Sequence, residues 1–365
     1  MTELRINAEP LSPAEFRHVF DSRLGDYSNE LEQQAMEVTP ELGEMIAYVN
    51  ASIRAGGKRL RPYLTYLGYT GHGGLDVDRA LDVGIASEIY HTYLLIHDDV
   101  IDRDLMRHGH PNVISRYSEA IKSKGVEEKD AEEASAAMGI LAGDVVFGIA
   151  FQKILHNPEI DDATKVRMLK TLTEVNLREC AGQQLDIMAP LLSHEQIDED
   201  YVIRTYSLKT SPYSFYLPLK FGLMLAGAKP EDVEYIQGYA EPAGVAFQIA
   251  DDLIGMYGEE ETAGKSVVSD LQEGKLTLLM LNGLKMADAS DRRLLLSYLG
   301  DPKADVPQLL LVRKIMEKSG AKARTLQTAR ELVTEAKQAL DSTNMLPSAK
   351  QRLSEITDSL IDRVN

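Results

Sequence analysis

Residues 90–105 read YHTYLLIHDDVIDRDL, and this stretch decides the character of the fold. Its apolar residues predict a helix that is largely buried. Asp98, Asp99 and Asp102 are set into that helix. Asp98 and Asp102 lie one turn apart on one face, so their carboxylates are about 6 Å apart and repel each other. Because removing each carboxylate from water costs several kcal/mol more, the helix needs a cation.

A divalent metal ion would meet this need. Carboxylate oxygens are typical ligands of magnesium, which also keeps water ligands and shares phosphate oxygens. The alternative is a solvated acidic patch that pairs with Arg103 and Arg107. The flanking apolar residues favour the metal site; they are Leu94, Leu95, Ile96, Val100 and Ile101.

A second segment, residues 247–255 with the sequence FQIADDLIG, repeats the pattern. Asp251 and Asp252 again interrupt an apolar helical stretch. Two such segments in one chain predict the opposing walls of a metal-bridged cavity. Metal ions held there would bind a polyanion between them, and a diphosphate fits best.

Basic residues supply the complementary charge. In residues 56–62, GGKRLRP, Arg61 can bind phosphate oxygens in a bidentate way and Lys58 can act as a point charge. The two glycines let an anion approach the backbone, although a solvated basic turn is the alternative. Lys265 and Lys275 follow the second aspartate pair.

Two weaker candidates complete the set. Pro212 cannot donate a hydrogen bond, so in a helix it frees the Leu208 carbonyl, which with the Thr210 hydroxyl would offer dipoles to a cation. An ordinary loop fits this segment equally well. His91 precedes Asp98 by two turns on the same face, where a core histidine is the alternative.

The rest of the chain has a helical period. Ser12 and Glu15 predict a capping box around Pro13, and Thr39 followed by Pro40 predicts a second helix start. No alternating apolar and polar runs are bounded by hairpin turns, so we predict an all-α fold. We expect one domain, built from N-terminal helices (10–55), a core that carries the motifs (56–275) and C-terminal helices (305–365).

Composition limits the possible partners. The chain has 365 residues, with 39 Lys and Arg against 57 Asp and Glu, and its formal charge of −18 argues against nucleic acid or an anionic membrane. Cys180 alone cannot form an intrachain disulfide, which favours a reducing compartment. The N-terminus has no apolar signal region, and even YLPLKFGLMLAGA contains Lys220. We therefore expect a cytoplasmic protein with no stable membrane insertion.

Together these motifs resemble those of the trans-type polyprenyl diphosphate synthases, which elongate isoprenoid chains. The resemblance runs from about residue 56 to residue 275 and continues more weakly through the C-terminal helices. It depends on a set of motifs: GGKRLRP, a histidine seven residues ahead of DDxxD, GQxxD, KT, and FQxxDD followed by two spaced lysines.

The resemblance implies a helical bundle around a central cavity, a homodimer and three magnesium ions for each active site. The implied metal ligands are Asp98, Asp99, Asp102, Asp251 and Asp252. The implied ligands of the allylic diphosphate are Arg107, Lys209 and Lys265. Isopentenyl diphosphate would be bound in a separate, metal-free site by Lys58, Arg61 and His91. The remaining implied cavity residues are Gln183, Asp186, Phe247 and Lys275, with Thr210 and Gln248 stabilising a carbocation.

The implied reaction condenses isopentenyl diphosphate with dimethylallyl, geranyl or farnesyl diphosphate. In the family, the residues four and five positions before the first aspartate set the product length; here they are Leu94 and Tyr93. An aromatic residue at the fifth position resembles enzymes that stop at the twenty-carbon geranylgeranyl diphosphate. A helical wheel alone places Leu94 beneath Asp98 and Tyr93 further round, so a farnesyl or longer-chain product stays open.

Two other functions share the helical fold. A class I terpene cyclase would ionise the same substrate, but it has no isopentenyl site to build and so no use for GGKRLRP or His91. A non-catalytic partner subunit would lose motif residues, whereas both aspartate pairs and their lysines are present.

The sequence departs from the family pattern at two positions. The second motif ends in Gly255 instead of an aspartate, which leaves one outer carboxylate missing. His108 replaces the second of two arginines, which normally grips isopentenyl diphosphate.

We expect this histidine to make the binding of isopentenyl diphosphate pH-dependent. Because histidine is fully charged only below about pH 6.5, the apparent KM should rise between pH 6 and 8. The variant His108→Arg should show a lower KM and a flat profile over the same range. A flat profile in the unmodified enzyme, together with an unchanged KM in the variant, would rule out this role.

Overall fold

The computed structural model describes residues 9–107, 109–258 and 268–362. Within them the chain is almost entirely helical, which confirms the predicted all-α class. The first helices are α1 (Pro13–Val38), α2 (Pro40–Arg54), α3 (Leu60–Gly71), α4 (Val77–Asp102), α5 (Val113–Lys122), α6 (Glu128–Leu155), α7 (Asp162–Met188), the 3-10 turn η1 (Ala189–Leu191) and α8 (Glu199–Lys209). The others are the π-helix η2 (Pro212–Tyr216), α9 (Leu217–Leu225), α10 (Pro230–Tyr257), α12 (Ser269–Gln272), α13 (Leu278–Met286), α14 (Ala289–Tyr298), α15 (Val306–Lys318), α16 (Ala321–Asp341) and α17 (Pro347–Asp362).

Both predicted helix starts are confirmed. Ser12 caps α1, where its Oγ accepts from the Glu15 backbone N–H at 3.4 Å and the Glu15 Oε2 accepts from the Ser12 N–H at 2.9 Å. Thr39 caps α2, and its Oγ1 accepts from the Leu42 N–H at 3.1 Å. The only strands in the described residues are β1 (Met106–Arg107) and β2 (His110–Pro111), an antiparallel pair just beyond the end of α4.

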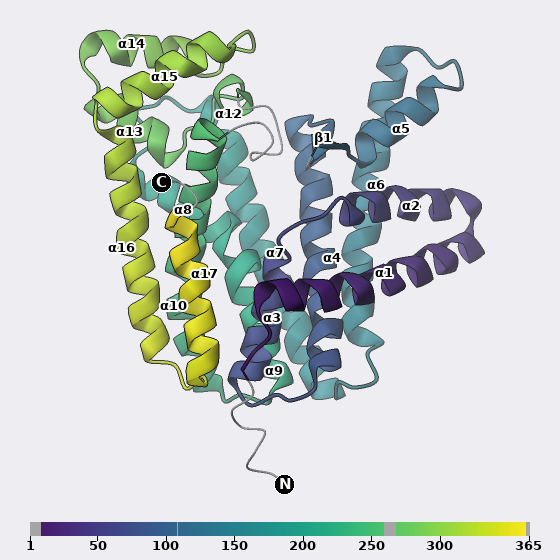
Figure 1. The fold of residues 1–365 in the computed structure, drawn as a ribbon. Helices are drawn as coiled ribbons and strands as arrows, with labels where there is room; N and C mark the ends of the chain where they lie inside the picture. Colours follow the sequence, from purple (N-terminus) through teal and green to yellow (C-terminus); the bar gives the residue numbers. More distant parts are fainter. Residues whose placement is uncertain (1–8, 108, 259–267, 363–365) are drawn as a thin grey trace.

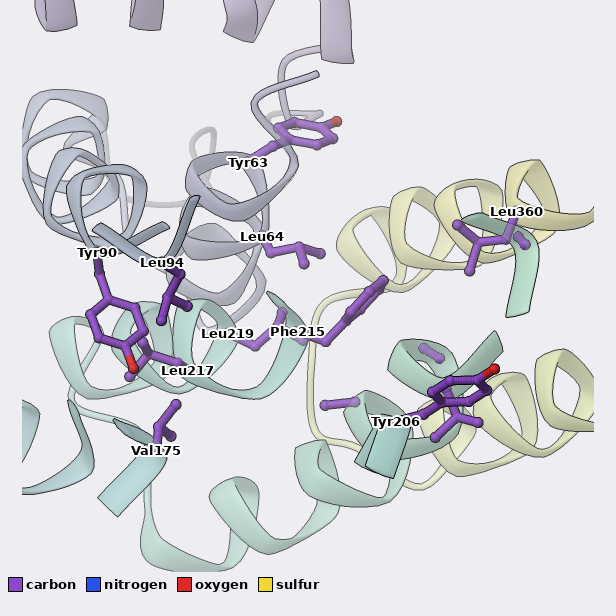
Figure 2. Packing of buried hydrophobic residues seen from close by; sticks show 14 of the residues in the cluster. Tyr63, Leu64, Tyr90, Leu94, Val175, Tyr206, Phe215, Leu217, Leu219 and Leu360 are labelled. Atoms are coloured by element: carbon purple, nitrogen blue, oxygen red, sulfur yellow. The ribbon is translucent and has the colours of Figure 1, made fainter. Parts of the chain in front are cut away.

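Long helices stand side by side and form the body of the molecule. Figure 1 shows α4, α6, α7, α10 and α16 with roughly parallel axes, while the α1–α2 hairpin crosses α4 and α6 and the α14–α15 pair lies over the α13 and α16 side. Buried side chains from α3, α4, α7, α8 and η2–α9 fill the space between them, among them Leu64, Tyr90, Leu94, Val175, Tyr206, Phe215 and Leu217 (Figure 2).

A close approach of two helices positions part of the site. Helices α3 and α9 cross at Gly222, where an added Cβ would lie only 2.2 Å from the Thr65 carbonyl oxygen. Glycine is therefore required for this contact. The approach brings η2, immediately before α9, against the start of α3, so that Ser214 and Tyr213 contact Arg61.

One described helix, α6, is long and apolar enough to cross a membrane as judged by length and composition. Its stretch from Ala134 to Phe151 is interrupted only by Ser135 and Asp144, so the sequence contains no uninterrupted apolar run here. Less than half of its most apolar window is buried in the structure. The expected absence of membrane insertion therefore stays a prediction.

Candidate functional site

A cavity of about 700 Å³ lies between α4 and α10. Most of the residues singled out in the sequence contribute to its lining. They are Lys58, Arg61, His91, Asp98, Asp99, Asp102, Arg107, Asp186, Lys209, Thr210, Phe247, Gln248, Asp251, Asp252 and Lys275. The two aspartate segments, more than 140 residues apart in the sequence, thus face one space, as a metal-bridged cavity requires.

The first wall is the last turn and a half of α4. Burial raises the pKa of Asp98, an effect that Lys209 opposes and Asp102 adds to. Asp99 is only 4% exposed, and burial raises its pKa to about 6 although Arg107 donates to it, through Nε at 2.9 Å and through Nη2. Of the alternative, a solvated acidic patch paired with Arg103 and Arg107, only the pairing of Arg107 with Asp99 is found, and Asp99 is buried instead of solvated.

The second wall is a turn of α10. Asp252 accepts hydrogen bonds on both carboxylate oxygens, from the Tyr206 hydroxyl and from Gln248 Nε2 at 2.9 Å. Burial nevertheless raises the pKa of Asp252 to about 7, and the negative charges of Asp270 and Asp251 contribute. Gln248 Oε1 in turn accepts from the Thr210 hydroxyl at 2.6 Å.

Two lysines lie between the walls. Lys275 Nζ is 3.4 Å from Asp102 Oδ2 on the first wall and 4.0 Å from Asp270 Oδ1 beside the second. Lys209 Nζ donates to Asp186 Oδ2 at 2.7 Å. Burial lowers the pKa of each ammonium, but the carboxylates around it, above all Asp98 for Lys209 and Asp270 for Lys275, raise it well above its ordinary value. Both lysines are therefore charged and offset part of the negative charge.

The donor set fits magnesium. The wall carboxylates are hard oxygen ligands, and the raised pKa values of Asp98, Asp99 and Asp252 indicate that the lysines do not fully compensate their charge. Among the residues that the structure describes, no three acidic, histidine or cysteine side chains converge closely enough to hold an ion by themselves. Such open walls suit an ion that completes its coordination with waters and phosphate oxygens.

The GGKRLRP segment forms the basic side of the cavity. Gly56 and Gly57, with φ of 113° and 149°, turn the chain into the start of α3. Arg61 Nη2 donates to Ser214 Oγ at 2.7 Å, and its guanidinium stacks 4.6 Å from the centre of the Tyr213 ring. Arg61 Nε is buried and has no hydrogen-bond partner among the described residues, which leaves a donor for a bound anion.

Arg59 holds this segment in place. Its Nη1 donates to Glu88 Oε1 and its Nε to Asp21 Oδ1, both at 2.7 Å, while Nη2 donates to the Ile53 carbonyl at 2.8 Å. Arg59 also has the left-handed φ of 51°. Its charge is therefore committed to Glu88 and Asp21, and this arginine ties the loop to α1 and α4.

Three predicted residues do not line the cavity. Gln183 was expected to line the cavity but is not among its lining residues, whereas Asp186, one turn later on α7, is. Tyr93 and Leu94 are buried away from it, and Leu95 and Ile96 line it instead. Lys265 and His108 lie outside the described residues.

Tyr93 packs where α4, α6 and α7 meet. Its hydroxyl donates to Asn176 Oδ1 at 3.3 Å, and its ring lies 4.8 Å from that of Phe147. This agrees with the helical wheel, which turns Tyr93 away from the Asp98 face.

Several residues of the site were not predicted from the sequence. Tyr206 contacts Asp252, Ser214 contacts Arg61, and Asp270 lies beside Gly255. None belongs to an acidic pair or to a basic motif, so no local pattern marks them. For Asp270 the only signal is its position between Lys265 and Lys275.

Comparison with known proteins identifies the family. The family model described as "Polyprenyl synthetase" matches residues 40–316. A short chain isoprenyl diphosphate synthase of Methanothermobacter thermautotrophicus is 31% identical over 336 residues, which cover 91% of this chain and 94% of the relative. A geranylfarnesyl diphosphate synthase of Aeropyrum pernix is 32% identical over 318 residues, which cover 86% and 92%.

The fold is shared with solved structures. The crystal structure of a geranylgeranyl pyrophosphate synthase from Corynebacterium glutamicum, complexed with isoprenyl diphosphate and magnesium, superimposes with a TM-score of 0.89 at 24% identity and covers 97% of this chain and 100% of that chain. With two acidic walls and a basic loop around one cavity, the chain belongs to the polyprenyl synthetase family, the trans-prenyltransferases that make prenyl diphosphates.

Proposed function

We propose that this enzyme condenses isopentenyl diphosphate with an allylic prenyl diphosphate in a magnesium-dependent reaction. The observation that carries the proposal is the meeting of both aspartate pairs and the GGKRLRP loop around one cavity. The chain would work as one catalytic domain, since the residues that line the cavity run from Arg17 on α1 to Thr277, just before α13.

The allylic diphosphate would bind at the acidic end of the cavity. Asp98, Asp99, Asp102, Asp251 and Asp252 would hold magnesium, three ions in the complete site. Magnesium neutralises the charge that develops on the leaving diphosphate and so favours cleavage of the allylic C–O bond. Arg107, Lys209, Lys265 and Lys275 would contact the same diphosphate.

Isopentenyl diphosphate would bind beside the basic loop, without metal. Arg61 offers its unpaired Nε, Lys58 a point charge and His91 a ring nitrogen. Because Arg59 clamps the loop to α4, the double bond of this substrate would be held at a fixed distance from the allylic carbon.

The reaction then needs no protein nucleophile. After the C–O bond breaks, the isopentenyl double bond forms the new C–C bond with the allylic cation, and a proton passes to the departed diphosphate. Thr210 and Gln248, whose side chains line the cavity, would stabilise the cation by their dipoles. Apolar residues such as Phe247, Leu95 and Ile96 would exclude water, which would trap the cation as an alcohol.

We propose geranylgeranyl diphosphate as the product. Relatives of this chain have names that range from farnesyl through geranylgeranyl to geranylfarnesyl diphosphate synthase. The packing of Tyr93 against Phe147 and Asn176 supports a floor built jointly by α4, α6 and α7.

A homodimer is also proposed. Helices α6 and α7 expose large apolar side chains, namely Ile140, Leu141, Leu155, Val166, Leu177 and Ile187, and a second copy of the chain could cover them. Sedimentation velocity would measure this. The cytoplasmic location stays a prediction.

One assay tests the function. Purified protein, magnesium and labelled isopentenyl diphosphate are incubated with dimethylallyl, geranyl or farnesyl diphosphate, and the products are sized. Label in longer prenyl diphosphates establishes a synthase. Release of hydrocarbon from farnesyl or geranylgeranyl diphosphate alone would instead show a cyclase, and inertness a partner subunit.

The metal-free protein should lose stability as the pH rises from about 4 to about 7. The folded-state pKa values of Asp99, about 6, and Asp252, about 7, exceed the usual aspartate value. The folded protein therefore keeps protons that the unfolded chain releases, so unfolding becomes easier by a few kcal/mol as these groups ionise.

Thermal unfolding in EDTA, measured across this pH range, should show the decline. Excess magnesium should reduce it, because the ion binds the ionised carboxylates, and Asp252→Asn should flatten it in EDTA. A melting temperature in EDTA that stays constant or rises would contradict the raised pKa values.

Asp270 should supply the carboxylate that Gly255 lacks. A Cβ added at Gly255 would lie 2.8 Å from Asp270 Oδ2, so the Asp270 carboxylate occupies the space in front of that position. The variant Asp270→Asn should weaken the magnesium-dependent binding of inorganic pyrophosphate about tenfold, as measured by calorimetry.

Moving the carboxylate back should restore binding. The double variant Gly255→Asp/Asp270→Ala should recover most of the affinity, whereas Gly255→Asp alone should bind poorly because the two carboxylates crowd each other. Glu273→Gln, which also removes a charge near Lys275, is the matched control. If this control lost as much affinity as Asp270→Asn, the position of Asp270 would not matter.

Replacing Tyr93 with alanine should lengthen the product by at least one isoprene unit. The change removes the ring that packs on Phe147 and opens space between α4 and α6. Tyr93→Phe keeps the ring and should leave the product length unchanged. Identical chain lengths from the wild type and Tyr93→Ala would remove Tyr93 from the floor.

A further inference from the structure

Tyr206 connects three segments of the chain through its hydroxyl, and the reaction proposed above gives this residue no role. Its ring lies on α8, one turn before Lys209, and is 8% exposed among the buried side chains (Figure 2). Its hydroxyl contacts α10 through Asp252 and the start of α13 through the Leu278 backbone N–H, at 3.0 Å. Two helices that carry cavity residues, α8 and α10, therefore meet the start of α13, just after the cavity residue Thr277, at one hydroxyl group.

The direction of each hydrogen bond follows from its partners. Leu278 is the first residue of α13, so its N–H has no acceptor within the helix and donates to the Tyr206 oxygen. A tyrosine hydroxyl has one proton, and since its oxygen already accepts from Leu278, it donates that proton to Asp252 Oδ2.

The same reasoning extends to Thr210. Asp252 Oδ1 accepts from the Gln248 amide nitrogen at 2.9 Å, which fixes the amide with its oxygen toward Thr210. That oxygen accepts the Thr210 proton at 2.6 Å. With its proton committed to Gln248, the Thr210 hydroxyl has only lone pairs left for the cavity that it lines.

We propose that Tyr206 is a positioning residue for prenyl transfer: through Asp252 and Gln248 its hydroxyl fixes the Thr210 hydroxyl with its lone pairs toward the reacting allylic group. This inference rests on the proposed function. A hydroxyl oriented in advance stabilises positive charge as it develops, without reorganisation during the step. Tyr206 also lines the cavity, but in this arrangement its hydroxyl acts on the reacting group through Asp252, Gln248 and Thr210.

The variant Tyr206→Phe tests the proposal, because it keeps the packed ring and removes only the hydroxyl. The single-turnover rate of condensation with farnesyl diphosphate should fall about 10- to 100-fold, as for other residues that orient reacting groups. The KM for isopentenyl diphosphate should change by less than about threefold, since Lys58, Arg61 and His91 are untouched. A rise of this KM by the same factor as the fall in rate would place the effect on substrate binding and overturn the proposal.

Tyr201→Phe is the matched control. Tyr201 lies on the same helix, and its hydroxyl donates to the Leu185 carbonyl at 2.8 Å, outside the Asp252 chain of hydrogen bonds. Its rate should stay within about twofold of the wild type. A rate loss equal to that of Tyr206→Phe would show that any hydroxyl removed from α8 has this effect, and the proposal would fail.

A double-mutant cycle with Thr210→Val supplies the decisive readout. If Tyr206 acts through Thr210, adding Tyr206→Phe to Thr210→Val should cost less than about threefold, and additive losses would overturn the proposal. Should Tyr206→Phe fail to fold, Tyr206→Met, which fills the buried position without a hydroxyl, is tested in the same cycle and should be equally non-additive with Thr210→Val. A wild type that forms no condensation product would refute the proposed function itself, whereas an active wild type with additive variants refutes only the role of Tyr206.

Discussion

The structure depends on carboxylates held in an apolar setting on two facing helices. Burial makes each ionised aspartate costly, and repulsion within and between the walls adds to the cost. Lys209 and Lys275 offset part of this charge from within the cavity, and Arg107 binds Asp99. The rest of the charge is what a diphosphate with its metal ions would balance. The same desolvation that weakens the empty site would therefore favour its ligands.

The scaffold keeps the walls and the basic loop in register by contacts distant in sequence. Arg59 ties the loop to α1 and α4, and the glycine crossing of α3 and α9 brings Ser214 to Arg61. Tyr206 joins α8, α10 and α13 beside the second wall. These contacts anchor the basic loop and the helices around the cavity, which suits a reaction whose reactants must be held close and dry.

The cavity and the product-length region are separate parts of α4. Residues such as Leu95 and Ile96 face the cavity, whereas Tyr93 and Leu94 turn toward neighbouring helices. A side chain that sets product length would then act from behind the cavity wall. It would limit the depth of the space between α4, α6 and α7 that a growing prenyl chain can enter. Phe147 and Asn176 share this position, so under this proposal Tyr93 would be one of several residues that bear on the limit.

The sequence by itself determined the all-α class, the starts of α1 and α2, and most residues of the cavity. These depend on local rules: the helical period, capping side chains, and acidic pairs within apolar segments. It could not reveal which aspartate pairs with Arg107, or that Tyr206 and Asp270 stand beside the second wall. Those facts were decided by the tertiary structure alone, because they depend on which side of a helix meets which neighbour. A helix fixes the angles between its own side chains, but only packing decides which of those side chains faces a charge, a cavity or another backbone.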